Sequence, residues 1–261
     1  MSVGKVSYQS CKMYSTKSLQ VEITSLCQAG CIDCNRWRPH QTEHDTQWQI
    51  NGVHPHMQKY YPLNDWKQHI GSFESIKHIQ FCGNMGDPMA HPDIVQICKE
   101  TKKIFPDIFL DISTNGGLGR LENYIALAGL GVNITFAVDG LEDTNHIYRR
   151  NVNWKKLQRN FRTYIDSGGR AAWQFIVFNH NNHQIEEARE RALHEGFTHF
   201  FTVETTRDNA IPAPVFHRET TELKCKACGS PELWKSLYID VEGRLWPCCW
   251  MSNHKSSSQV Y

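Results

Sequence analysis

The chain has 261 residues, of which 40% are hydrophobic, so it can bury one large core, alone or with a small appendage. Its 28 Lys and Arg residues against 27 Asp and Glu give a formal net charge of +1, which makes no electrostatic case for nucleic acid or an anionic membrane as partner. No apolar run approaches the ~20 residues that span a bilayer, and the first residues lack a signal-peptide pattern. We therefore expect a cytoplasmic protein, in which ten cysteines indicate metal chemistry rather than disulfides.

Short apolar-alternating runs alternate with segments of helical period along most of the chain. Residues 1–18 are polar and are predicted to form an N-terminal extension, and residues 19–206 to form the main domain. Strands are expected at 19–24, 76–82, 108–113, 132–138, 172–178 and 198–203, and helices at 63–71, 93–105, 121–128, 154–167 and 184–195. This order predicts an α/β fold with a parallel sheet. When curled, such a sheet is a partial (β/α)6 barrel with its chemistry at the carboxyl ends of the strands.

The first predicted strand leads into residues 27–34, which read CQAGCIDC and are called the cysteine loop below. Three thiolates from one short loop can hold three irons of a [4Fe–4S] cube and leave the fourth iron open. A zinc knuckle completed by His40 or His44, or a loop of free thiols, is the alternative.

Glycine-containing turns follow the next three predicted strands. Residues 83–88 read GNMGDP, where glycines let a ligand approach the backbone closely. Residues 113–116 read STNG, with hydroxyl and carboxamide groups able to bind a ribose, although Asn-Gly is also a plain turn signal. Asp139-Gly140 ends the fourth strand, and Arg149 follows it. These turns are either ordinary strand-to-helix connections or ligand contacts.

Residues 207–261 are predicted to form a second, cysteine-defined module after a proline-containing linker at 211–214. Strands at 238–241 and 244–246 around Glu242-Gly243 predict a β-hairpin. The module contains Cys225, Cys228, Cys248 and Cys249. A zinc ribbon is one interpretation, but its second knuckle would need Cys-x-x-Cys rather than two adjacent cysteines.

Taken together, these motifs resemble the radical S-adenosylmethionine (SAM) superfamily. The cysteine loop has the spacing of the family's signature, apart from Asp33, where an aromatic residue often stands. Residues 83–88 resemble the family's Gly-Gly-Glu-Pro turn, with two extra residues and Asp87 for Glu. Residues 137–149 resemble the Ser-x-Asp-Gly stretch and downstream Arg of the SPASM-containing branch, with Ala137 for Ser.

The resemblance implies a set of cofactor contacts. Cys27, Cys31 and Cys34 are expected to be the catalytic ligands of a [4Fe–4S] cluster that binds SAM at its open iron. The expected SAM contacts are Gly83, Asn84, Gly86, Asp87, Ser113, Asn115, Asp139 and Arg149. Residues 207–261 resemble a twitch-type or truncated SPASM module, which implies a second, auxiliary [4Fe–4S] cluster. Its expected ligands are Cys225, Cys228 and Cys248; the fourth position is expected to be filled by Cys249 or another group, or to be open.

The implied activity is reductive cleavage of SAM to a 5′-deoxyadenosyl radical, which abstracts a hydrogen from the substrate. By family analogy the expected substrate is a peptide or protein side chain, and the expected reductant an external one-electron donor such as flavodoxin or ferredoxin. A dehydrogenase of a small sugar or aminocyclitol alcohol is the alternative enzyme. A non-catalytic zinc- or cluster-binding interaction protein is the alternative from another class.

Overall fold

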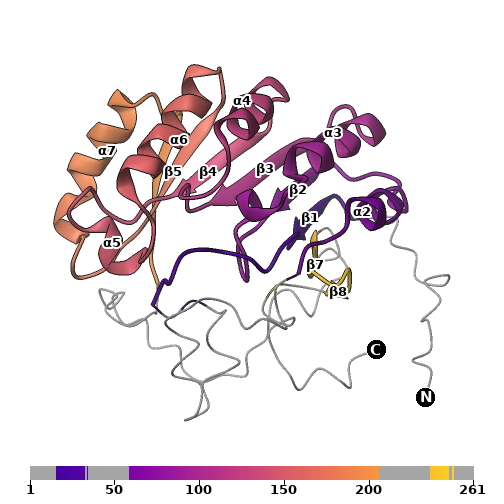
Figure 1. Cartoon of the computed structure of the whole chain (residues 1–261), viewed down its shortest axis with the longest axis horizontal. Coiled ribbons are helices and arrows are strands. Elements are labelled where there is room, and N and C mark those ends of the chain that lie inside the picture. The colour runs from indigo at the N-terminus through magenta and orange to yellow at the C-terminus, as the bar shows by residue number, and fades with distance from the viewer. Residues whose placement is uncertain (1–15, 33, 35–58, 206–235, 247–248, 250–261) are drawn as a thin grey trace, which may run out of the picture.

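The computed structural model describes residues 16–32, 34, 59–205, 236–246 and 249. Within them the strands form one sheet in the order β6-β5-β4-β3-β2-β1-β7-β8 (Figure 1). The first six strands pair in parallel with their sequence neighbours. They are β1 Ser18–Val21, β2 His78–Phe81, β3 Phe109–Thr114, β4 Asn133–Ala137, β5 Ala171–Ile176 and β6 His199–Val203.

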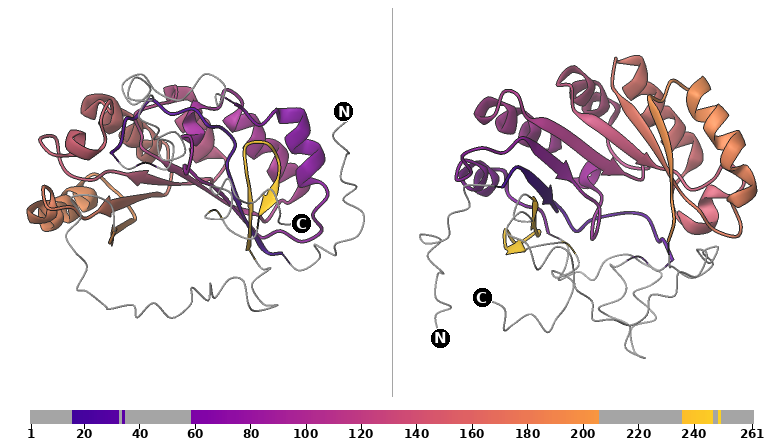
Figure 2. Two further views of the ribbon diagram at one scale, coloured as in Figure 1. Left: turned by 90° about the horizontal axis from the view of Figure 1, so that it is seen from below. Right: turned by 180° about the vertical axis from the view of Figure 1, so that it is seen from behind.

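Helices follow five of these strands and gather on one face of the sheet (Figures 1 and 2). The long ones are α2 Leu63–Ile70, α3 Ile94–Ile104, α4 Leu121–Gly129, α6 Trp154–Asp166 and α7 Ile185–His194. Shorter turns of helix are η3 Pro88–Ala90, α5 Asn145–Tyr148 and η4 Asn182–Gln184. The predicted α/β fold, a partial barrel with a parallel sheet, is confirmed. None of the helices in the described residues is long and apolar enough to cross a membrane.

Strand alternation decides which side chains meet the helices, because successive residues of a strand point to opposite faces. On the covered face, Phe81 contacts Trp66 of α2, and Phe136 packs against Phe161 and Tyr164 of α6. All five side chains are buried. Their polar neighbours in the strands point to the other face, so the core lies between sheet and helices and a polar surface remains opposite.

The C-terminal hairpin belongs to the same sheet. Strand β7 (Ser236–Ile239) pairs in parallel with β1, and β8 (Leu245–Trp246) pairs antiparallel with β7. Gly243 has φ 78° in the connecting turn, a conformation that favours glycine. The predicted hairpin therefore exists, and it extends the barrel sheet beyond β1. The domain boundary predicted at residue 207 lies outside the described residues and stays a prediction.

Candidate active site

The cysteine loop leaves the carboxyl end of β1 and borders a cavity of about 270 Å³. Cys31 is buried, and Cys27 and Cys34 are half-buried. Lining residues come from the ends of β1 to β5, and among them are the three cysteines, Gly83, Asn84, Gly86, Asp87, Ser113, Asn115, Ala137 and Arg149. All the sequence-predicted SAM contacts except Asp139 therefore border one space.

The possible metal ligands can be compared with what a zinc ion and an iron–sulfur cluster each require. A zinc ion needs its ligands around one centre, and in the described residues no group of three or more His, Cys, Asp or Glu side chains could hold a single ion. A [4Fe–4S] cube instead binds each cysteine to a different iron, so its ligands surround a larger space than the ligands of one ion, and the three cysteines border one cavity. His40 and His44 lie outside the described residues.

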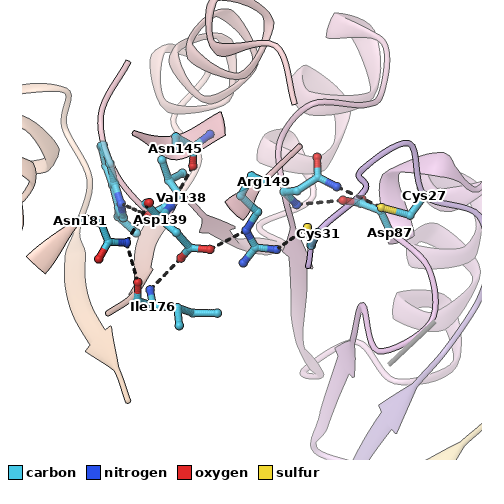
Figure 3. Close-up of polar contacts among 11 residues, drawn as sticks. Cys27, Cys31, Asp87, Val138, Asp139, Asn145, Arg149, Ile176 and Asn181 are labelled. Carbon is cyan, nitrogen blue, oxygen red and sulfur yellow. Dashed lines mark hydrogen bonds and ion pairs between the residues drawn. The ribbon is translucent and has the colours of Figure 1, made fainter. Parts of the chain in front are cut away.

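Hydrogen-bond donors approach the sulfurs of Cys27 and Cys31. Asn115 Nδ2 and the Ala29 amide each lie 3.4 Å from Cys27 Sγ. Arg149 Nη1 lies 3.9 Å from Cys31 Sγ (Figure 3). Burial raises the pKa of the Cys31 thiol, while the Arg149 charge opposes that shift. Donors and a cation around sulfur favour the thiolate, which is the form that ligates iron.

Asp87 joins the turn after β2 to the turn after β3. Its carboxylate accepts hydrogen bonds from the Met89 amide at 2.9 Å, the Thr114 hydroxyl at 2.8 Å and the Asn115 amide at 2.8 Å. Asp87 is 3% exposed, and burial raises the pKa of its carboxyl. Its oxygens are thus engaged by the protein, and Asp87 fixes the position of Asn115 beside Cys27.

Asp139 holds Arg149 at the edge of the cavity. Its Oδ2 lies 2.6 Å from Arg149 Nε, and its Oδ1 accepts the Ile176 amide at 2.7 Å (Figure 3). Asp139 is fully buried and does not line the cavity. The structure therefore places Arg149 at the site and Asp139 behind it.

Three glutamines at the barrel interior were not singled out in the sequence, and one of them contacts the predicted Ser113. Gln20 on β1, Gln80 on β2 and Gln174 on β5 line the cavity from the face without helices. Gln20 donates to Gln80 at 3.1 Å, and Gln80 donates to Ser113 at 3.3 Å. Strand alternation alone would have placed these side chains opposite the core.

Glu22 is the buried carboxylate that sequence reasoning missed. It is 1% exposed and lies at the end of β1, five residues before Cys27. Burial raises the pKa of Glu22 to about 8, against the effect of the backbone amides that bind it. In the sequence it looks like one more polar position of an alternating strand, and only its partners in the fold distinguish it.

The C-terminal cysteines are described only in part. Cys225, Cys228 and Cys248 lie outside the described residues. Cys249 is half-buried and lines the same cavity as the cysteine loop, as does Cys82 after β2. The predicted auxiliary ligand set stays a prediction.

The fold is a parallel α/β partial barrel, and its first strand leads at the carboxyl end into a three-cysteine loop. These two features together indicate a barrel enzyme that binds an iron–sulfur cluster. The sequence profile of the radical SAM superfamily matches residues 21–192. The chain belongs to the radical SAM superfamily. Membership implies a [4Fe–4S] cluster and SAM as cofactors, and the residues around the cavity fit both. No curated protein matches the chain in sequence.

Solved structures give the same fold. SuiB from Streptococcus suis bound to its precursor peptide SuiA aligns with a TM-score of 0.63 at 13% identity, covering 92% of this chain and 61% of SuiB. SuiB bound to SAM aligns with 0.62 at 14% identity, covering 94% and 62%. The enzyme anSMEcpe with bound AdoMet aligns with 0.55 at 12% identity, covering 74% and 55%. The chain thus spans less than two thirds of these proteins.

Proposed function

We propose that the protein is a radical SAM enzyme that modifies a peptide or protein side chain. The observation that carries the proposal is the convergence of Cys27, Cys31, Cys34, Asn115 and Arg149 on one cavity at the carboxyl ends of parallel strands. When bound, the cluster and SAM supply reductive cleavage to a 5′-deoxyadenosyl radical, which takes a hydrogen atom from a substrate C–H bond.

The chain's own groups bind and orient these cofactors. The three cysteines ligate the cluster, and Asn115, Ala29 and Arg149 stabilise the thiolate form of their sulfurs. We assign the guanidinium of Arg149, held by Asp139, to the carboxylate of SAM, because this pairing is charge-assisted and planar.

The remaining SAM contacts are assigned to the two turns. Gly83, Asn84 and Gly86 border the cavity, and we assign their backbone to the amino group of SAM. Ser113 also borders it, and we assign its hydroxyl to the ribose. The Asn115 side chain donates to Cys27 Sγ, and the Asp87 carboxylate accepts the Asn115 amide. We assign both residues to positioning the cysteine loop rather than to direct contact with SAM.

A polypeptide substrate is supported by the glutamines of the cavity. A carboxamide carries one acceptor oxygen and two N–H donors, which match the N–H and C=O of a peptide group. Gln20, Gln80 and Gln174 bring three such groups to the interior surface. The similar protein SuiB has been solved with its precursor peptide, which supports the same substrate class.

We further propose that Cys225, Cys228, Cys248 and Cys249 bind an auxiliary [4Fe–4S] cluster. The position of Cys249 at the cavity supports a second cluster close to the substrate. Iron and sulfide analysis of the triple variant Cys27→Ala/Cys31→Ala/Cys34→Ala tests this. The variant should retain about half of the wild-type iron, and a variant without iron would contradict the second cluster.

The activity is tested by anaerobic reconstitution with iron and sulfide, followed by dithionite and SAM. We expect 5′-deoxyadenosine from the wild type and none from the triple variant. A protein that binds only zinc, or one that makes no 5′-deoxyadenosine, would overturn the proposed function. The substrate class is tested by adding peptides or sugar alcohols and measuring which raises the yield; Gln174→Leu should lower the response to peptide.

A further inference from the structure

One carboxylate lies beneath the turn that follows β2. Glu22 Oε2 accepts the backbone amides of Asn84 and Met85, each at 3.1 Å, and Oε1 accepts that of Gly86 at 2.8 Å. Three consecutive amides of a ligand-facing turn are thus bound to one side chain, which is 1% exposed.

The same residue is bound to the C-terminal hairpin. The Tyr238 hydroxyl of β7 donates to Glu22 Oε2 at 3.2 Å, and the Glu22 amide donates to the Ile239 carbonyl at 2.8 Å. The two Glu22 oxygens thus accept the three amides and the Tyr238 hydroxyl, and the Cys82 thiol lies 4.0 Å from Oε2. Tyr238 is buried as well. Glu22 therefore joins β1, the turn after β2 and β7.

These amide contacts fix where the carbonyls of the turn point. In a trans peptide group the N–H and C=O point in opposite directions. When the amides of residues 84–86 point at Glu22, the carbonyls of Gly83, Asn84 and Met85 point away from it. Gly83, Asn84 and Gly86 line the cavity, whereas Glu22 does not. Carbonyls that point away from Glu22 are available as acceptors for a cationic ligand group in the cavity.

The turn lies so close to other backbone atoms that neither of its glycines has room for a side chain. A Cβ on Gly86 would lie 2.0 Å from the Thr24 carbonyl oxygen, and one on Gly83 would lie 2.9 Å from the Gly86 carbonyl oxygen. The turn is therefore pressed against the backbone after β1, and Glu22 supplies the hydrogen-bond acceptor within that contact. Without an acceptor, one buried and two partly buried amides would lose their partner, and the turn would open toward water.

We propose that Glu22 is a positioning residue that orients the carbonyls of residues 83–85 toward the ammonium group of SAM. Tyr238 couples this orientation to the position of β7 in the sheet. The inference rests on the proposed function, because it takes SAM as the ligand of the cavity. It adds that the C-terminal hairpin contributes to SAM affinity through one hydroxyl, without itself contacting SAM.

The test compares Glu22→Gln and Tyr238→Phe in the full-length, reconstituted protein. A glutamine directs N–H groups toward amides that need an acceptor, so we expect SAM binding, measured by equilibrium dialysis, to weaken by about tenfold or more. For Tyr238→Phe, which removes one donor and leaves the three amides in place, we expect a loss of about threefold. Amide hydrogen exchange at residues 84–86 should accelerate in both variants.

Matched controls separate positioning from general destabilisation. Glu195→Gln replaces a buried glutamate between α6 and α7, and Tyr164→Phe removes a buried hydroxyl that donates to the Val132 carbonyl. Neither should change SAM affinity or exchange at residues 84–86. If Tyr238→Phe binds SAM as tightly as Tyr164→Phe, the proposed coupling between Tyr238 and the turn is wrong. Because Tyr238→Phe is conservative, it still tests the proposal if Glu22→Gln fails to fold. A wild type that binds no SAM would instead overturn the proposed function.

Discussion

The Arg149 guanidinium and the Asp139 carboxylate form a buried ion pair in which Nε and Oδ2 are 2.6 Å apart, with side chains 14% and 0% exposed. Burial by itself opposes the charge of Arg149, but Asp139 and Cys31 raise the pKa of the guanidinium above its ordinary value. Asn181 completes the arrangement by donating to the carbonyls of Asp139 at 3.0 Å and Ile176 at 2.9 Å. The charge that faces the cavity is therefore held by the ends of β4 and β5.

Asp139→Asn should destabilise the fold because it leaves a largely buried arginine without its counter-charge. Removing one partner of a buried pair costs about 3 kcal/mol. The expected result is a loss of that size in the free energy of unfolding, measured by urea denaturation of wild type and variant. A loss below about 1 kcal/mol would mean that water or a neighbouring group already balances Arg149.

Asn115→Ala should make the cluster harder to reduce. The carboxamide N–H lies 3.4 Å from Cys27 Sγ, and a donor to a ligand sulfur stabilises the more negative, reduced cluster. Loss of a hydrogen bond worth about 1 kcal/mol corresponds to ~40 mV for one electron. Redox titration followed by electron paramagnetic resonance should show this negative shift.

Iron content separates this tuning from loss of the cluster. It should remain at the wild-type value in Asn115→Ala, because all three cysteines are retained. An unchanged potential with full iron content would exclude Asn115 as a tuning group for the cluster.

The alternation of strands and helices was predictable from sequence because each element carries its own periodicity. Residues 108–113 alternate as a strand does, and the structure has β3 at Phe109–Thr114. Likewise, the helix predicted at 154–167 is α6, Trp154–Asp166, which buries Leu157, Phe161 and Tyr164. Local pattern suffices for such elements, since one face of each is buried against the same core.

Long-range pairing was not predictable in the same way. The hairpin around Gly243 has a local turn signal, but its parallel pairing with β1 joins residues more than 200 positions apart. The role of Glu22 depends on that pairing and on the turn after β2. Asp87 likewise gains its function from Thr114 and Asn115. Polar residues whose partners lie on other strands look like surface positions until the sheet is assembled.

Gly86→Ala should displace the turn after β2, because the added Cβ would lie 2.0 Å from the backbone carbonyl oxygen of Thr24. A backbone atom cannot move aside as a side chain can, so we expect a cost of about 2 kcal/mol or more in unfolding free energy. SAM binding should weaken with it. Urea denaturation and equilibrium dialysis measure the two effects.

Gly129→Ala is the matched control, since a Cβ there meets nothing within 4 Å at the end of α4. It should leave stability unchanged or raise it by about 0.5 kcal/mol, because alanine favours the helix. Equal effects of the two substitutions would show that the turn after β2 tolerates a side chain.

Glu195 offers a test of pH dependence away from the active site. It accepts Arg162 Nε at 2.6 Å and Arg191 Nε at 2.8 Å, and the hydrogen bond from Arg162 is the main reason that its pKa is lowered to about 2. A lowered pKa stabilises the fold above the usual value of about 4.5, and this contribution is lost as the pH falls toward 2. Because both arginines are partly exposed, Glu195→Gln should cost only about 1 kcal/mol in unfolding free energy at pH 7.

Urea denaturation at pH 7, 4 and 3 should show the difference in unfolding free energy between Glu195→Gln and wild type shrinking below pH 4.5. A difference that stays constant or grows on acidification would mean that Glu195 stabilises the α6–α7 contact by packing rather than by charge.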